Sequence, residues 1–156
     1  MKNIKNKILI FGLSTILLGC SQSATSVFDK DPLYAQNMQY TKIIKVVEKN
    51  NVNAIFNITY LNSVNSKKWD NNKQNFLIGS YSVDNNISKY LLRMNGMSQI
   101  AAHPISKENQ LYKDIAFKNY WGKYNIVTFD DSDSKTLTLM YKYGEDNNIS
   151  TTFIKE

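Results

Sequence analysis

Hydrophobic residues follow two different patterns along this chain. One is a single apolar run near the N-terminus, Ile8–Leu18, broken only by Gly12, Ser14 and Thr15. From about residue 41 onward, apolar and polar residues instead alternate in short segments separated by clusters rich in Asn and Asp. Alternation with a period of two is typical of half-buried β-strands, because successive side chains point to opposite faces of a sheet. The pattern therefore separates an N-terminal segment from a strand-rich body.

The first predicted β-hairpin covers residues 41–60. Apolar residues alternate with polar ones over 52–60, and the turn-like cluster Glu48–Asn51 precedes them. Residues 41–49 fit a helical stripe as well as a strand, because their apolar residues recur at helical spacing and are also β-branched. The β-branched residues and the turn that follows favour a strand, with a helix as the alternative.

Five further strands are predicted from the same pattern, and the clusters between them contain Asn, Asp and Gly, which suit tight turns. The strands are Phe76–Val83, Tyr90–Met94, Tyr124–Phe129, Thr136–Tyr143 and Ile149–Ile154. Residues 27–38 show no clear period and are expected to be an irregular lead-in, while residues 97–122 are expected to hold a connecting loop and a short helix. Seven strands with short polar turns predict an all-β fold, an antiparallel immunoglobulin-like β-sandwich of about seven strands.

The composition fits one folded domain. The chain has 156 residues, of which 42% are hydrophobic and 12% aromatic, including ten Tyr and seven Phe. This is enough apolar material for a single core, and the aromatic content favours strands.

The N-terminal run has the parts of an export signal. Lys2, Lys5 and Lys7 give a positive start, and the apolar residues follow directly. Eleven residues in a helix span about 16 Å, roughly half of a hydrocarbon core of about 30 Å. The run is therefore too short for a stable membrane span.

The run ends in Leu17-Leu18-Gly19-Cys20, which resembles the lipobox of bacterial lipoproteins. The resemblance implies that residues 1–19 are a lipoprotein signal peptide, that the lipoprotein signal peptidase cuts between Gly19 and Cys20, and that the Cys20 sulfur carries a lipid group. A thiolate is the nucleophile that can form such a thioether. Two or three acyl chains would hold the protein firmly on a membrane, so we expect it to act at a membrane surface.

The resemblance also divides the rest of the chain. Residues 20–26 are expected to be the lipidated cysteine with a small, polar and flexible tether, and residues 27–156 a single β-sandwich domain. In Gram-negative envelopes an Asp after the cysteine commonly signals retention in the inner membrane. Ser21 therefore resembles the class sorted to the outer membrane, which we expect rather than the inner membrane.

Charge and cysteine content exclude several classes. The formal charge is +6, but 19 basic residues become 16 against 13 acidic ones once the three N-terminal lysines are removed. Nucleic-acid binding requires a concentrated basic face, so no nucleic-acid partner is expected. Cys20 is the only cysteine and His103 the only histidine, which excludes an intrachain disulfide and a zinc site with several Cys and His ligands.

An Asp cluster and the histidine could indicate a metal site and a catalytic base, but each has a simpler structural interpretation. Asp130, Asp131 and Asp133 have the composition of a calcium loop, but they lack the spacing, the Gly and the Glu of an EF-hand, so we expect a hairpin turn. His103 would suit a catalytic base in a loop, but no nucleophile signature accompanies it. We therefore expect no catalytic residue, no metal and no cofactor.

Three aromatic residues are the candidates for binding. Trp69 lies in the polar segment Ser66–Lys73, where we expect it to be exposed, and Tyr120 and Trp121 directly precede a predicted strand. Exposed Tyr and Trp are typical of contact sites with proteins and sugars. The alternative for each tryptophan is a place in the core.

Two five-residue segments are similar to the extended acceptor pattern of bacterial N-glycosylation, in which an acid stands two residues before Asn-x-Ser. They are Asp84–Ser88 and Asp146–Ser150, and the resemblance implies glycan attachment at Asn86 and Asn148 if the host has that machinery. The alternative is a repeated turn that leads into an Ile-containing strand.

Together these features predict a membrane-anchored envelope lipoprotein that is a non-enzymatic binding or assembly module. Its expected partners are the membrane, through the lipid anchor, and another envelope protein, a glycan or a host surface. One alternative is a carrier with a hydrophobic ligand cavity between its sheets. The other is a small periplasmic enzyme or enzyme accessory that acts on envelope polymers.

Overall fold

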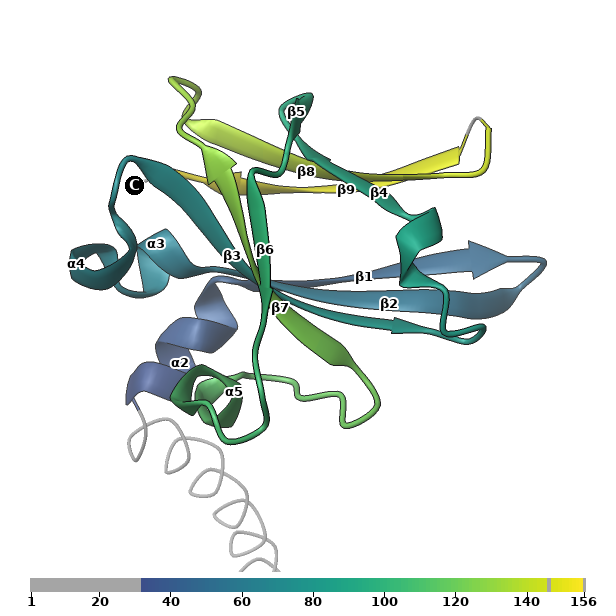
Figure 1. Ribbon diagram of the computed structural model, residues 1–156, viewed down its shortest axis with the longest axis horizontal. Coiled ribbons are helices and arrows are strands. Elements are labelled where there is room, and N and C mark those ends of the chain that lie inside the picture. Colours follow the sequence, from purple (N-terminus) through teal and green to yellow (C-terminus); the bar gives the residue numbers. More distant parts are fainter. Residues whose placement is uncertain (1–31, 146, 156) are drawn as a thin grey trace, which may run out of the picture. The chain divides into compact units, whose positions relative to one another are not determined.

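The computed structural model describes residues 32–145 and 147–155, and all of these except Pro32 belong to one unit, Leu33–Glu156. The described residues form nine strands in two antiparallel sheets (Figure 1). One sheet has the order β1-β2-β3-β7-β6 and the other β5-β4-β8-β9. The strands are β1 Thr41–Glu48, β2 Asn51–Tyr60, β3 Lys73–Ser82, β4 Leu91–Met94, β5 Met97–Ser98, β6 Ala101–Pro104, β7 Lys123–Asp130, β8 Thr136–Tyr143 and β9 Asn147–Ile154.

The prediction of an all-β sandwich is confirmed. Nine strands replace the expected seven because β5 and β6 have only two and four residues, too few to show alternation. The helices are short: α2 Pro32–Gln39, α3 Leu61–Val64, α4 Ser66–Trp69, the 3₁₀ helix η1 Ile87–Lys89 and α5 Gln110–Asp114. The immunoglobulin-like subtype stays a prediction.

The first hairpin forms as expected, and residues 41–48 are a strand rather than a helix. β1 pairs with β2 from Thr41 opposite Thr59 to Glu48 opposite Asn51. Lys49 and Asn50 both have positive φ, 48° and 65°. Two residues with positive φ give the turn twist that matches the twist of the flanking strands.

Two sequence predictions need correction. Part of the expected irregular lead-in is the helix α2, whose eight residues make about two turns, too few to establish a helical period. Pro32 suits its first position, where a missing N–H costs nothing. The other part, residues 27–31, lies outside the described residues.

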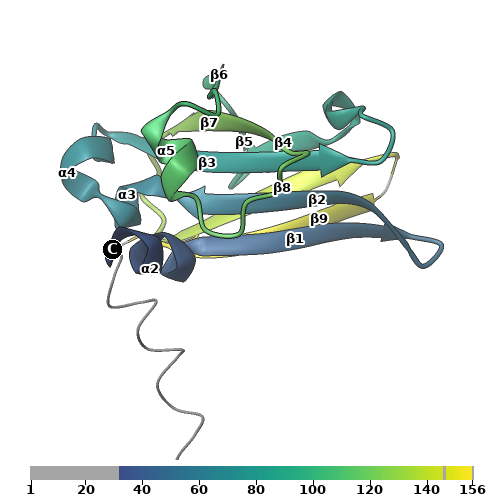
Figure 2. The same cartoon turned by 90° about the horizontal axis from the view of Figure 1, so that it is seen from below.

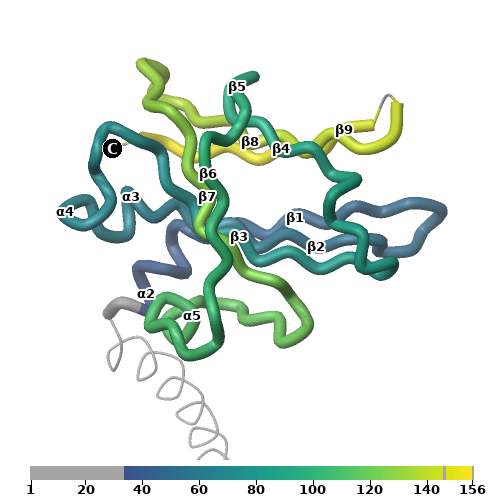
Figure 3. Tube along the Cα trace, in the orientation of Figure 1, coloured from purple at the N-terminus to yellow at the C-terminus, as the bar shows by residue number. Residues whose placement is uncertain are grey.

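The segment after β7 is also not a hairpin turn. Residues 130–134 carry the chain from β7, in the five-stranded sheet, to β8, in the four-stranded sheet. β7 pairs with β3 and β6, whereas β8 pairs with β4 and β9. The turn-forming residues were recognised correctly, but local composition does not say which strands pair. The chain also crosses between the sheets from β3 to β4 and from β5 to β6, which makes three crossings among the described strands (Figure 3).

The main core fills the layer between the two sheets and is rich in aromatic rings. Tyr141 from the four-stranded sheet stacks on Phe56 from the five-stranded sheet, with ring centroids 3.9 Å apart. Other buried rings of this layer include Tyr60, Phe76, Phe129 and Phe153. Burial of such side chains is the main source of stability in a domain of this size.

A second, smaller cluster covers the outer face of the five-stranded sheet. It contains Leu61, Leu77, Tyr112, Ile115 and Tyr124. Figure 2 shows α2 and α5 on this side of the sheet. β3 is therefore buried on both faces.

Gly79 of β3 lies directly behind the ring of Tyr124. A Cβ atom at this position would be 2.2 Å from Tyr124 Cε1, so only glycine fits without a shift of the ring.

Within residues 32–145 and 147–155, no helix has both the length and the apolar character that crossing a membrane requires.

Candidate ligand-binding cleft

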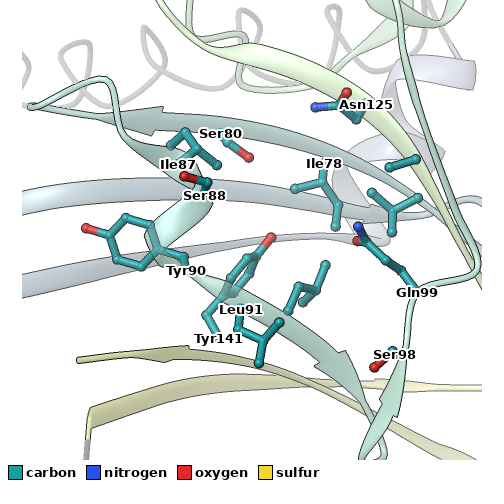
Figure 4. A pocket seen from close by; sticks show the side chains of 13 residues that line it. Ile78, Ser80, Ile87, Ser88, Tyr90, Leu91, Ser98, Gln99, Asn125 and Tyr141 are labelled. Atoms are coloured by element: carbon teal, nitrogen blue, oxygen red, sulfur yellow. The ribbon is translucent and has the colours of Figure 1, made fainter. Parts of the chain in front are cut away.

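A cleft of about 350 Å³ lies between the two sheets, at the end opposite the aromatic cluster of Tyr60, Phe76 and Phe153 (Figure 4). The five-stranded sheet supplies Ile78, Ser80, Ala102, Asn125 and Val127, and the four-stranded sheet supplies Leu91, Leu92, Ser98 and Tyr141. Residues 87, 88, 90 and 99 complete the lining.

The cleft exists because the inward-facing side chains of β3 become smaller along the strand. Alternation places residues 76, 78 and 80 on one face, and they change from Phe to Ile to Ser. On β7 the inward-facing residues 129, 127 and 125 change from Phe to Val to Asn in the same direction. Phe76 pairs with Val127 and Ile78 with Asn125, so the inward-facing side chains of both strands become smaller toward the same end of the sheet. On these two strands, large rings at one end are replaced by small side chains at the other, which leaves a cleft beside Tyr90 and Tyr141 of the facing side.

Several polar side chains of the cleft have no hydrogen-bond partner among the described residues, and the Tyr90 hydroxyl is the one that is also fully shielded from solvent. Ser80 and Tyr141 are 7% and 3% exposed, and Asn125 is half-buried. Figure 4 shows the hydroxyl groups of Tyr141 and Ser80 in the space between the sheets. Burial of the Tyr90 hydroxyl without a partner costs about 1–3 kcal/mol, which a ligand that hydrogen-bonds it would recover. The polar groups of Ser80, Asn125 and Tyr141 reach the cleft and are available to a ligand.

The cleft carries no formal charge. Its lining contains no Asp, Glu, Lys, Arg or His. Burial raises the pKa of the Tyr141 phenol, which keeps this hydroxyl protonated and neutral at physiological pH. The apolar walls with a few neutral donors and acceptors therefore suit an uncharged ligand that has both apolar and polar surface.

The predicted aromatic residues lie elsewhere. Trp121 and Tyr120 are 82% and 71% exposed and belong to the connection between α5 and β7. Trp69 is only partly buried, at the end of α4, and packs against the outer-face cluster. Its carbonyl accepts hydrogen bonds from Asn62 Nδ2 at 3.1 Å and Asn75 Nδ2 at 2.9 Å. The exposure expected for Trp69 is therefore only partial, whereas Tyr120 and Trp121, for which no exposure was predicted, are strongly exposed.

The two glycosylation candidates are both exposed but have different local structures. Asn86 precedes η1, its N–H donates to Asp84 Oδ1 at 3.1 Å, and Ser88 Oγ donates to Asn86 Oδ1 at 2.7 Å. Asn148 lies within β9, opposite Lys142. The repeated sequence therefore forms a turn and a 3₁₀ helix in one place and a strand in the other.

Two of the acidic residues and the histidine that suggested chemistry lie in ion pairs or in a strand. Asp130 pairs with Lys73 at 2.6 Å and Asp131 with Lys155 at 2.7 Å. Among the described residues, no group of three His, Cys, Asp or Glu side chains is close enough to hold a metal ion. His103 lies in the edge strand β6 and not in a loop as expected. The prediction was wrong because β6 has only four residues, too few to show alternation. Gly19 and Cys20 lie outside the described residues.

Sequence reasoning missed the cleft residues Ser80, Asn125 and Tyr141. The sequence does contain a relevant feature, because the inward-facing side chains of the predicted strand become smaller from Phe76 through Ile78 to Ser80. Its meaning depended on the pairing of β3 with β7, which the sequence does not state. Comparisons with protein-family models, with curated proteins and with solved structures find no match.

Proposed function

We propose that this protein is a membrane-anchored envelope lipoprotein whose β-sandwich is a non-enzymatic binding module for a small, uncharged, amphipathic ligand. The observation that carries the proposal is the cleft, where Ser80, Asn125 and Tyr141 have no hydrogen-bond partner among the described residues. This combines the predicted binding module with the predicted carrier of a ligand between the sheets.

The size and chemistry of the cleft define the ligand class. A volume of about 350 Å³ is at the lower end of the range for small-molecule sites, about 300–1,000 Å³. Ile78, Leu92 and Val127 offer apolar contact, and the neutral polar groups would fix orientation. One residue of a neutral glycan, or a short alcohol or amide, has this combination of surfaces.

The anchor is supported by the lipobox sequence Leu17–Cys20 that follows the apolar run. Metabolic labelling with a fatty acid tests it. We expect label on the native protein and none on a Cys20→Ser variant, and label on that variant would contradict the anchor.

Ligand binding is tested on full-length Cys20→Ser protein, which lacks the lipid. Native mass spectrometry identifies small molecules that co-purify, and calorimetric titration measures binding of neutral sugars, short alcohols and amides. In the Ser80→Leu variant the added side chain occupies the cleft, so we expect binding to be lost. For Tyr141→Phe we expect a three- to tenfold weaker affinity, the effect of about one neutral hydrogen bond.

The matched control is Tyr143→Phe. Tyr143 lies two residues further along β8, packs against the same core and does not line the cleft. Its loss of a hydroxyl should leave affinity unchanged. Equal binding by wild type, Ser80→Leu and Tyr141→Phe would overturn the proposed site.

A further inference from the structure

The segment between α5 and β7 exposes three large aromatic side chains within five residues. Phe117 is 46% exposed, and Tyr120 and Trp121 are the two most exposed large hydrophobic side chains of the described chain. Single exposed apolar residues are ordinary on protein surfaces, but a cluster of this kind is typical of a contact surface. We call Phe117–Trp121 the aromatic loop.

The aromatic loop is held in place by hydrogen bonds to the sheet beneath it. Asn57 Nδ2 donates to the Phe117 carbonyl at 2.6 Å, and the Asn119 N–H donates to Tyr124 Oη at 2.8 Å. Within the loop, the Trp121 N–H donates to Asn119 Oδ1 at 3.0 Å. The backbone polar groups therefore face the protein while the rings face outward, so the exposure is part of the folded structure.

Phe117 also has an unusual backbone conformation. Its φ is 59°, in the left-handed region that bulky residues rarely adopt. Such strain persists where surrounding contacts impose it, and it is found preferentially at functional positions.

The surroundings of the loop are basic. Lys113, Lys118 and Lys123 flank the rings. The nearby acids are Glu108, which interacts electrostatically with Lys113, and Asp114. Lys118 Nζ donates to the Lys113 carbonyl at 2.5 Å. Asp114 accepts a hydrogen bond from Gln110, and none of the three lysines forms an ion pair with a described residue. The surface is thus complementary to anionic groups.

The folded unit begins on the same side. Asn37 of α2 lines a common cavity with Gln110 and Asp114 of α5. Figures 1 and 2 show α2, α5 and the connection to β7 on the outer side of the five-stranded sheet. Eleven residues lie between Cys20 and Pro32, and the twelve steps from one to the other can extend at most about 40 Å. A lipid on Cys20 would keep the domain within about this distance of the bilayer, so the aromatic loop can reach the membrane surface.

We infer that the aromatic loop inserts its rings into the headgroup region of the membrane that carries the anchor, with the three lysines at anionic headgroups. Trp, Tyr and Lys are the residues that favour this interface, and a shallow contact of this kind adds to a lipid anchor. The outer face of the five-stranded sheet then faces the bilayer. This orientation rests on the anchor of the proposed function, whereas the affinity of the loop for lipid does not.

The first test uses the lipidated full-length protein in vesicles of phosphatidylethanolamine and phosphatidylglycerol. In a Trp69→Phe background Trp121 is the only tryptophan, and we expect its emission to shift to the blue and to be quenched by brominated phospholipids. The Trp121→Phe protein, in which Trp69 alone reports, is the control and should show neither effect. Trp121 emission that is unquenched in vesicles would overturn the inference.

The second test uses protein without the lipid anchor. It therefore separates an error in the predicted anchor from an error in the inferred lipid contact of the aromatic loop. Cys20→Ser protein without residues 1–19, so that the apolar run Ile8–Leu18 cannot bind lipid, should co-sediment weakly with the same vesicles, and more weakly at high salt. Tyr120→Ser/Trp121→Ser should reduce this partition by about tenfold or more, since about 25 cal/mol per Å² of apolar surface is lost. Val83→Ser, which removes another exposed apolar residue, is the control and should have no effect. Absence of vesicle binding by the unlipidated protein would overturn membrane contact. So would a result in which the Tyr120→Ser/Trp121→Ser variant loses a cross-link to an envelope protein while Trp121 shows no quenching by lipid.

Discussion

The two ends of the space between the sheets are built from the same strands and filled in opposite ways. At one end the rings of Tyr60, Phe76 and Phe153 lie with centroids 5.0–6.0 Å apart. At the other end β3 and β7 present Ser80 and Asn125 to a cleft. We call these the packed end and the open end.

The buried tyrosines show the same contrast. At the packed end Tyr60 Oη donates to Gln74 Oε1 at 2.6 Å, and Gln74 Nε2 donates in turn to Asp131 Oδ1. At the open end the Tyr141 hydroxyl has no partner among the described residues. A packed core with satisfied polar groups contributes stability, whereas an open space with unpartnered polar groups contributes little or none. Substitutions at the two ends should therefore have different effects.

The largest difference is expected from removal of a ring at the packed end. Phe76 is fully buried and contacts Tyr60, Phe129 and Phe153. Phe76→Ala should lower the free energy of unfolding by about 3–5 kcal/mol, since it leaves a cavity that the sheets cannot close. Urea denaturation of the Cys20→Ser protein measures this loss. Ser80→Ala, on the same face of β3 at the open end, should change stability by less than about 0.5 kcal/mol. A comparable loss at Ser80 would contradict the comparison.

How far the sequence predicts this contrast depends on the range of the interactions. The alternation of β8 and the Asn-rich turn at Lys49–Asn50 are local features, and both were predicted. The crossover after β7 and the short strand β6 depend on pairing between distant residues, and both were missed.

The candidate site divides in the same way. Tyr120 and Trp121 were recognised as candidate binding residues from their local setting, but their strong exposure was not predicted, whereas the exposure expected for Trp69 is only partial. The cleft requires β3 beside β7 and β8 across from them, so Tyr141 could not be recognised as a site residue before the sheets were known.

A smaller effect separates the two buried tyrosines. Tyr60→Phe leaves the buried Gln74 side chain without the Tyr60 hydroxyl and should cost about 1–2 kcal/mol. Tyr141→Phe removes a hydroxyl that faces the cleft and has no partner among the described residues, so stability should change by less than about 0.5 kcal/mol. Thermal and urea unfolding of both variants measure the difference. Equal destabilisation would show that the Tyr141 hydroxyl is bonded in solution and would weaken the case for the cleft.

The smallest effect concerns the carboxylate that closes the packed end. Asp131 accepts hydrogen bonds from Lys155 Nζ at 2.7 Å and from the Ser132 N–H at 2.8 Å, and the Lys155 ammonium is the main reason that its pKa lies below the ordinary value of 3.8. A carboxyl with a lowered pKa in the folded state stabilises the protein above pH 3.8, and the stabilisation disappears as the pH falls through the lowered pKa.

Because the Asp131 side chain is 45% exposed, screening by water limits this contribution to about 0.5 kcal/mol. Asp131→Asn should therefore be slightly less stable than wild type at pH 7, and the two proteins should converge in stability near pH 2. Asp133→Asn is the matched control, since Asp133 is exposed on the same crossover and should leave the pH profile unchanged. If Asp131→Asn and Asp133→Asn had identical profiles, the polar chain from Tyr60 through Gln74 would not depend on the Asp131 charge. The packed end would then be stabilised by its rings alone.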